Sequence, residues 1–239
     1  GLMYTGLVAF VVFGGGRRIA KTAEMIVPFM AIGYILLALV ILAVNFDKID
    51  DVFGLIFSCA FNRNAVFGAV FGQAVQWGVK RGVFSNEAGQ GTGAQASGAA
   101  EVSHPAKQGL VQAFSVYVDT LFVCTATAVM ILSTNAYNVA DPANQGGFIV
   151  QHIPGIAKSN FTQAAVNSFI PGAGGAFVAI ALFLFTFTTV LAYAFYADSS
   201  IGYLCQKNTR GPGYRYGILS SRLAIVAMTF IGAVGSVDV

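Results

Sequence analysis

The stretch Gly82–Gly93, GVFSNEAGQGTG, interrupts an apolar segment that otherwise predicts a membrane-spanning helix. Its four glycines and its Ser-Asn-Glu triplet favour a break in the helix. Lipid cannot pair the N–H and C=O groups that such a break exposes, so the break must be buried in protein or line a watery cavity. Transporters bind substrates and ions at broken helices. The sequence therefore predicts a solute-binding site at about residues 82–93.

The composition excludes a soluble domain. Of the 239 residues, 56% are hydrophobic and only 10% are charged, whereas a soluble domain has about a quarter charged residues. The apolar runs are continuous rather than alternating, which favours helices over a β-barrel. We therefore predict an all-α polytopic membrane protein, with the lipid bilayer as its surroundings.

Other classes of function find no support in the sequence. The net charge of +3 comes without a basic tract, so we expect no nucleic-acid partner. Cysteines 59, 124 and 205 are far apart and predict neither a disulfide nor a metal site. There is no phosphate-binding loop and no nucleophile elbow, so we expect no enzyme activity and no cofactor.

We expect one transmembrane domain with about six membrane segments. The second segment has Pro28 in its first turn, where proline is well tolerated. Short helices are expected at Val52–Phe61 and Asn160–Phe169, outside the membrane segments. No signal peptide is predicted, and the chain reads as incomplete at both ends. The predicted membrane segments are 2–13, 26–45, 65–102 (broken), 106–132, 172–204 and 217–235.

Lysine and arginine residues predict the orientation, because cytoplasmic loops carry an excess of them. Three basic residues, Lys48, Arg63 and Lys158, fall on one side of the predicted spans. Seven fall on the other side, which we therefore predict to be cytoplasmic. These seven are Arg17, Arg18, Lys21, Lys107, Lys207, Arg210 and Arg215.

Glu87 is the first candidate for binding, because an ionisable group within a span is costly and usually functional or paired. Lys80 and Arg81 offer it a purely structural pairing, and that alternative stays open. Around Glu87, backbone carbonyls at the end of one half-helix could bind a cation. Backbone N–H groups at the start of the other half-helix favour a carboxylate. An amino acid carries both charges and suits such a break.

Two further groups of polar residues lie within predicted spans. Thr188 and Thr189 could provide hydroxyl oxygens for Na⁺, although threonines in membrane helices often bond back to the preceding turn. Asp119 must face protein or water, either as a hydrogen-bonding hub or in coupling. The sequence leaves both alternatives open.

Three motifs carry a resemblance to a known family: KRGVFSNEAGQG at 80–91, HPAKQG at 104–109, and YVDTLFVCT at 117–125. They resemble the alanine or glycine:cation symporter family, the sodium:alanine symporters. The resemblance extends over essentially the whole chain. It implies part of a leucine-transporter-like fold of two inverted five-helix repeats, in which this chain would supply helices 4 to 9. Helices 1 to 3, with the other half of the substrate site, would be missing.

The resemblance also implies roles for individual residues. Thr188 and Thr189 fall where the eighth helix of this fold gives hydroxyls to a shared sodium site. Tyr193 replaces a usual tryptophan, which leaves the choice among alanine, glycine and glutamine open. The unwound part of the sixth helix, which faces the substrate, would comprise Phe84, Ser85, Asn86, Glu87, Ala88 and Gly89.

Together these features predict sodium-coupled symport of a small neutral amino acid by alternating access, as a multi-pass protein of the plasma (inner) membrane. Na⁺ would be the co-transported ion, with protons as the alternative. A non-transporting amino-acid-binding protein or an inactive fragment is the competing interpretation. An ion channel fits less well, because the polar groups concentrate at one depth.

Overall fold

A computed structural model of the chain describes most of its residues. For residues 58–61 and 65–74 it describes the backbone only. The described residues are 1–61, 65–87, 89, 91–141, 147–155, 160–205 and 211–235.

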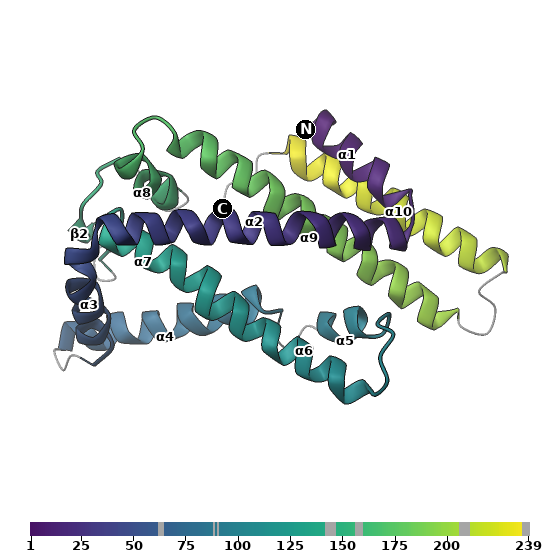
Figure 1. Cartoon of the computed structure of the whole chain (residues 1–239), viewed down its shortest axis with the longest axis horizontal. Coiled ribbons are helices and arrows are strands. Elements are labelled where there is room, and N and C mark those ends of the chain that lie inside the picture. The colour runs from purple at the N-terminus through teal and green to yellow at the C-terminus, as the bar shows by residue number, and fades with distance from the viewer. Residues whose placement is uncertain are drawn as a thin grey trace. The chain divides into compact units, whose positions relative to one another are not determined.

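The described chain is predominantly helical (Figure 1). Residues 105–133 form one continuous helix, whose central turn, η2, is π-helical. The elements in order are α1 (Leu2–Val12), α2 (Gly16–Val44), η1 (Phe46–Lys48), α3 (Ile49–Phe61), α4 (Ala65–Ser85), α5 (Thr92–Ser97), α6 (Pro105–Val118), η2 (Asp119–Cys124), α7 (Thr125–Ser133), β1 (Asn138–Ala140), β2 (Phe148–Gln151), α8 (Phe161–Phe169), α9 (Gly174–Leu204) and α10 (Pro212–Val234).

Four of the described helices are long and apolar enough to cross a membrane. They are α2, the continuous helix at 105–133, α9 and α10. Each has at least 23 residues, whereas a bilayer core needs about 20. The prediction of a helical, polytopic membrane protein is therefore confirmed. α1 is also apolar but has only 11 residues.

The start of α2 differs from the prediction. The helix begins at Gly16, so Pro28 lies well inside it, and its placement in a first turn was wrong. The basic residues Arg17, Arg18 and Lys21 suggested a loop, but a helix can continue past the membrane into water. Gly15, with φ +90°, marks the turn before it. Proline within a membrane helix is tolerated because neighbouring groups satisfy the freed carbonyl.

The predicted helix break is present, but it is narrower than residues 82–93. α4 continues to Ser85 and α5 starts at Thr92, so Phe84 and Ser85 are helical rather than unwound. The second half-helix is also shorter than expected and ends at Ser97. Gly89 and Gly91 both have φ +83°. This left-handed conformation is accessible to glycine at little cost, which explains why the break is glycine-rich.

The connection between residues 133 and 171 was expected to be a polar loop with one short helix. The helix is confirmed as α8. β1 and β2 form an antiparallel pair that the sequence did not predict. The Asn138 side chain closes this pair, because its Nδ2 donates to the carbonyl of Ile153 (2.7 Å) and its Oδ1 accepts from the Ile153 N–H (2.9 Å). The other expected short helix, Val52–Phe61, lies within α3.

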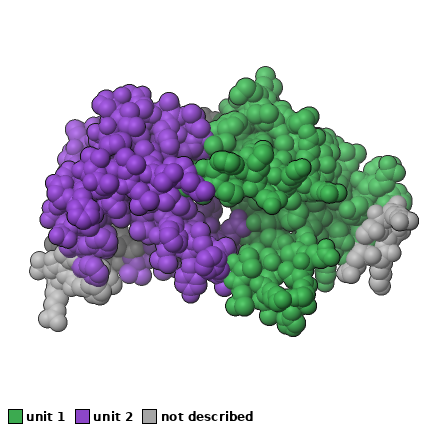
Figure 2. Space-filling view, in the orientation of Figure 1, with its two compact units in different colours: residues 1–31, 90–112, 182–239 green, residues 32–89, 113–181 purple. Residues whose placement is uncertain are grey.

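The chain divides into two compact units (Figure 2). Unit 1 comprises residues 1–31, 90–112 and 182–239, and unit 2 comprises residues 32–89 and 113–181. One boundary falls between Gly89 and Gln90, inside the helix break.

Each unit has its own apolar core. In unit 1, α1 packs beside α10 and also contributes to a cluster with α9 and Ile19. In unit 2, the cluster joins α2, α7 and α8. The buried residues of the first core are Val8, Val11, Val12, Ile19, Phe187, Leu191 and Ala194; those of the second are Ile41, Met130, Ala136, Ala165 and Val166.

Candidate functional site

The first edge of the break, at the end of α4, is held by side-chain hydrogen bonds within unit 2. Ser85 Oγ donates to Asp119 Oδ2 over 2.6 Å. Asn86 Nδ2 donates to the carbonyl of Gly82 (3.0 Å) and to Thr120 Oγ1 (3.2 Å). The same Gly82 carbonyl also accepts the Asn86 backbone N–H. The end of α4 is thus bonded to the π-helical turn η2.

One atom at this edge lacks a partner. Asn86 Oδ1 is buried and makes no hydrogen bond in the described chain. Turning the amide over would not help, because Oδ1 would then face the oxygen of the Gly82 carbonyl, which is also an acceptor. A buried acceptor without a donor costs about 1–3 kcal/mol. A cation or the ammonium group of a ligand would satisfy this oxygen.

The π-helical turn gathers polar groups from one helix. In a π-helix, residues five apart lie above one another, and here Cys124 Sγ lies 3.9 Å from Asp119 Oδ2. Thr125 Oγ1 donates to the carbonyl of Thr120, also five residues earlier, over 3.0 Å. Ser85 Oγ completes the group at 3.8 Å from Cys124 Sγ. Asp119 Oδ2 therefore accepts from both Ser85 and Cys124, and the role of Asp119, structural or in coupling, stays a prediction.

Glu87 lies in the break itself. It has φ +52°, a left-handed conformation that is uncommon for a residue with a side chain. Lys80 and Arg81, which the sequence offered as its partners, lie over the ring of Trp77 at 5.2 and 5.7 Å from its centre. Phe84 is exposed on the last turn of α4. Ala88 lies outside the described residues.

The second edge of the break belongs to unit 1. Thr92 begins α5, and its buried Oγ1 has no hydrogen-bond partner in the described chain. Ser199 Oγ donates to the carbonyl of Gln95 over 2.9 Å, which ties α5 to the end of α9. Thr92, like Asn86 in unit 2, thus carries one buried oxygen without a partner among the described residues.

Thr188 and Thr189 lie in the middle of α9, also in unit 1. Both hydroxyls donate to carbonyls of the preceding turn: Thr188 to Leu184 and Phe185 (3.0 Å each), Thr189 to Phe185 (2.8 Å). This back-bonding was the structural alternative for these residues. It also leaves the lone pairs of both oxygens pointing away from the donated proton, where a cation could use them. Tyr193 follows on α9 and packs edge-on against Tyr196.

Sequence reasoning missed an ion pair in unit 1. Arg222 of α10 binds Asp198 of α9 through Nη2 (2.6 Å) and Nε (3.4 Å), and both side chains are largely buried. Asp198 was not among the candidate residues of the sequence analysis. The pairing of Asp198 with Arg222 cannot be recognised from the sequence, because the two residues are 24 positions apart.

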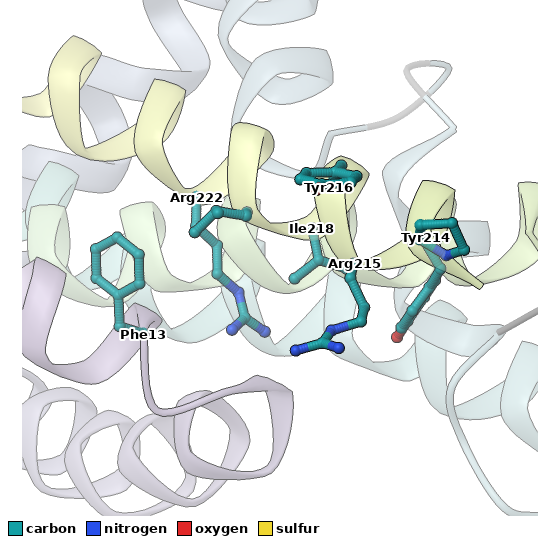
Figure 3. Close-up of a pocket in the computed structure, with 8 residues that line it drawn as sticks. Phe13, Tyr214, Arg215, Tyr216, Ile218 and Arg222 are labelled. Atoms are coloured by element: carbon teal, nitrogen blue, oxygen red, sulfur yellow. The ribbon is translucent and has the colours of Figure 1, made fainter. Parts of the chain in front are cut away.

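Arg222 also faces a hollow of about 640 Å³ between the end of α1 and the start of α10 (Figure 3). The guanidinium groups of Arg222 and Arg215 point to the same side of α10 there. The hollow contains none of the residues proposed for solute binding. Its lining residues are Phe13, Pro212, Tyr214, Arg215, Tyr216, Ile218, Leu219 and Arg222.

Comparison with known proteins shows which family the chain matches. The model of the sodium:alanine symporter family matches residues 1–239. The chain is 52% identical over 235 residues to a sodium/proton-dependent alanine carrier protein of Bacillus sp. (strain PS3), covering 98% of this chain and 52% of the carrier. It is 39% identical over 236 residues to a sodium/alanine symporter of Methanococcus maripaludis, covering 99% and 48%.

A third relative differs in its named substrate. The chain is 37% identical over 238 residues to a probable sodium/glutamine symporter of Bacillus subtilis, covering 100% of this chain and 45% of the symporter. The chain spans about half the length of the curated relatives it matches.

Proposed function

We propose that this chain, which belongs to the sodium:alanine symporter family, takes part in the sodium-coupled symport of a small neutral amino acid across the plasma membrane. Membership confirms the resemblance that the three sequence motifs indicated. The four long apolar helices make the chain an integral membrane protein. Alanine or glycine is the expected substrate, with glutamine as the alternative that one relative's name suggests.

The expected architecture is leucine-transporter-like. α4 and α5 are the two halves of its broken sixth helix, and the continuous helix at 105–133, α9 and α10 are helices 7, 8 and 9. The break at 86–91, with long helices following it, supports this assignment. Helices 1 to 3 would come from elsewhere in the full-length carrier and would complete the substrate site.

The buried, unpartnered Oδ1 of Asn86 is the observation that carries the binding site. It lies at the edge of a break in which Glu87 and Gly89 both adopt left-handed backbone. An ammonium group or Na⁺ bound there would replace the missing donor. On this basis the substrate-binding residues are proposed to be Phe84, Ser85, Asn86, Glu87, Ala88 and Gly89, and Tyr193 of α9 is proposed from the family resemblance alone.

The sodium site is proposed at Thr188 and Thr189. Each hydroxyl gives its proton to its own helix, so its oxygen keeps lone pairs that can accept a cation. Inward movement of one Na⁺ down a membrane potential of 100 mV releases about 2.3 kcal/mol. A tenfold Na⁺ gradient adds about 1.4 kcal/mol, which together supports accumulation of several hundredfold.

Uptake of radiolabelled alanine by the full-length carrier in proteoliposomes tests this function. We expect uptake to require an inward Na⁺ gradient and to stop when choline replaces Na⁺. A protonophore control separates the two cations, because two relatives are named as sodium/proton-dependent. Uptake that is unchanged in choline but abolished by the protonophore would overturn sodium coupling in favour of protons.

A further inference from the structure

We propose that the π-helical turn η2 is the device that positions the solute-binding break, with Asp119 and Thr120 as its positioning residues. This inference rests on the proposed transport function and adds residues that do not themselves touch the solute. The observation behind it is that both side chains at the end of α4 bond to consecutive residues of η2. Ser85 bonds to Asp119, and Asn86 bonds to Thr120.

The π-helical geometry explains why this contact is possible. In an α-helix, residues four apart share a face, whereas the wider π-turn stacks residues five apart. Asp119 and Cys124 therefore come onto one face, and both reach Ser85 Oγ, at 2.6 and 3.8 Å. Conversion of η2 to an α-helical turn would rotate these two residues apart and break the group. π-turns are frequent at functional sites for this kind of reason.

The bond to Thr120 has a direct effect on the free oxygen of Asn86. Nδ2 has two protons, and here one points to the Gly82 carbonyl and the other to Thr120 Oγ1. With both protons committed, the plane of the amide is set, and so is the direction of Oδ1. Loss of the Thr120 acceptor leaves the amide held at the Gly82 carbonyl alone, free to rotate about that bond. Asn86 Oδ1 then remains a hydrogen-bond acceptor, but its direction is no longer fixed.

The hydrogen bond from Ser85 to Asp119 fixes the backbone at the end of α4, whereas the bond to Thr120 fixes the amide of Asn86. Ser85 is the last residue of α4 and Asn86 the first beyond it, so anchoring Ser85 fixes the point at which the chain leaves the helix. Among the described residues, the one ion pair is Arg222–Asp198, so the carboxylate of Asp119 acts here through hydrogen bonds. An asparagine at 119 keeps an acceptor oxygen for Ser85 and should preserve much of this anchor.

Valine and serine substitutions at Thr120 test the amide step in the full-length carrier. Thr120→Val removes the acceptor at almost constant shape, and we expect the KM for alanine to rise about tenfold, the size of one hydrogen bond, with Vmax nearly unchanged. Thr120→Ser restores the hydroxyl and should recover a KM within about twofold of wild type. Thr229→Val is the matched control, because the Thr229 hydroxyl donates to the Ile225 carbonyl of its own helix, α10, and lies outside η2.

Cys124 provides a readout that does not depend on transport. It is a free, exposed cysteine within 3.8 Å of Ser85 Oγ, so its rate of labelling by a maleimide reports on the contact between α4 and η2. In a carrier without Cys59 and Cys205, we expect labelling to be faster in Ser85→Ala than in wild type. Alanine with Na⁺ should slow labelling in wild type but less in Ser85→Ala.

The outcomes separate this inference from the proposed function. If wild type transports alanine with Na⁺ but Thr120→Val and Ser85→Ala match it in KM and in Cys124 labelling, the positioning role is wrong and symport stands. If Thr229→Val raises KM as much as Thr120→Val, the effect is a general loss of helix packing and the inference falls. If wild type shows no sodium-dependent uptake, the proposed function itself fails.

Discussion

At the scale of single residues, the two ends of the Asn86 amide differ: the nitrogen bonds at the end of α4, and the oxygen has no partner among the described residues. Its amide nitrogen and backbone N–H both bond to the Gly82 carbonyl and so terminate α4. Its amide oxygen remains buried without a partner. A residue that only capped the helix would not need to bury that oxygen, since exposure to water would satisfy it. This unsatisfied acceptor is the reason that we propose a ligand-facing role for Asn86.

Alanine substitution of Asn86 should therefore abolish alanine uptake while leaving the carrier inserted in the membrane. Asn45 is a matched control, because its Nδ2 also donates to the carbonyl four residues earlier, Ile41, over 2.9 Å at the end of α2. Asn45→Ala loses a comparable cap, at a cost of about 1 kcal/mol, and should still transport. Uptake and the amount of inserted protein are measured together. Wild-type uptake in Asn86→Ala would remove this residue from the site.

At the scale of elements, the structure joins helices through a few polar contacts set in apolar surroundings. α9 is tied to α10 by the Asp198–Arg222 pair and to α5 by Ser199. α4 is tied to η2 by Ser85 and Asn86. Since apolar side chains distinguish poorly between lipid and protein, such contacts select which helices meet. These polar residues thus define which helices pair.

The Asp198–Arg222 pair should be a main contributor to the stability of unit 1. Both side chains are only 13–16% exposed, so Arg222→Gln leaves a largely buried carboxylate without its cation, at a cost of about 3 kcal/mol. We expect a clear fall in the thermal midpoint of the detergent-purified carrier. The exchange Asp198→Arg with Arg222→Asp should recover part of it.

Arg215→Gln controls for the loss of an arginine from α10. Arg215 lies on the same helix and lines the same hollow (Figure 3), but it makes no ion pair with the described residues. Its substitution should leave the midpoint close to wild type. Equal midpoints for Arg222→Gln and Arg215→Gln would show that the ion pair does not stabilise the fold.

At the scale of the whole molecule, the two compact units divide the candidate residues. Ser85, Asn86, Asp119 and Thr120 belong to unit 2, whereas Thr92, Thr188 and Thr189 belong to unit 1. The division falls within the break at Gly89 and Gln90. Alternating access requires parts of a carrier to move against each other around a fixed site.

The orientation of the chain in the membrane is the prediction at this scale. Lys107, in the first turn of α6, belongs to the basic set that we expect in the cytoplasm, and Lys48, in η1 after α2, belongs to the other. In a cysteine-free carrier, Lys48→Cys should react with an impermeant maleimide added to intact cells. Lys107→Cys should react only after permeabilisation. The opposite labelling pattern would reverse the predicted topology.

The sequence by itself determined the helical membrane architecture, the family and the presence of a break near residue 86. These follow from local chemistry: apolar runs of sufficient length, motif residues, and glycines that tolerate left-handed backbone. Two helix boundaries predicted from polar residues were wrong. The predicted start of α2 lay after the basic residues, and the predicted break opened at Gly82, although α4 continues to Ser85.

Only the tertiary structure decided which polar groups meet. Ser85 and Asp119 are 34 residues apart, and Asp198 and Arg222 are 24 apart. These separations are too long for a local sequence pattern to reveal either pair. The π-helical turn was equally hidden, because one extra residue in a helical turn changes no composition or hydropathy. Whether a threonine or an aspartate binds, caps or positions depends on the helix that packs against it, and packing is a property of the folded chain.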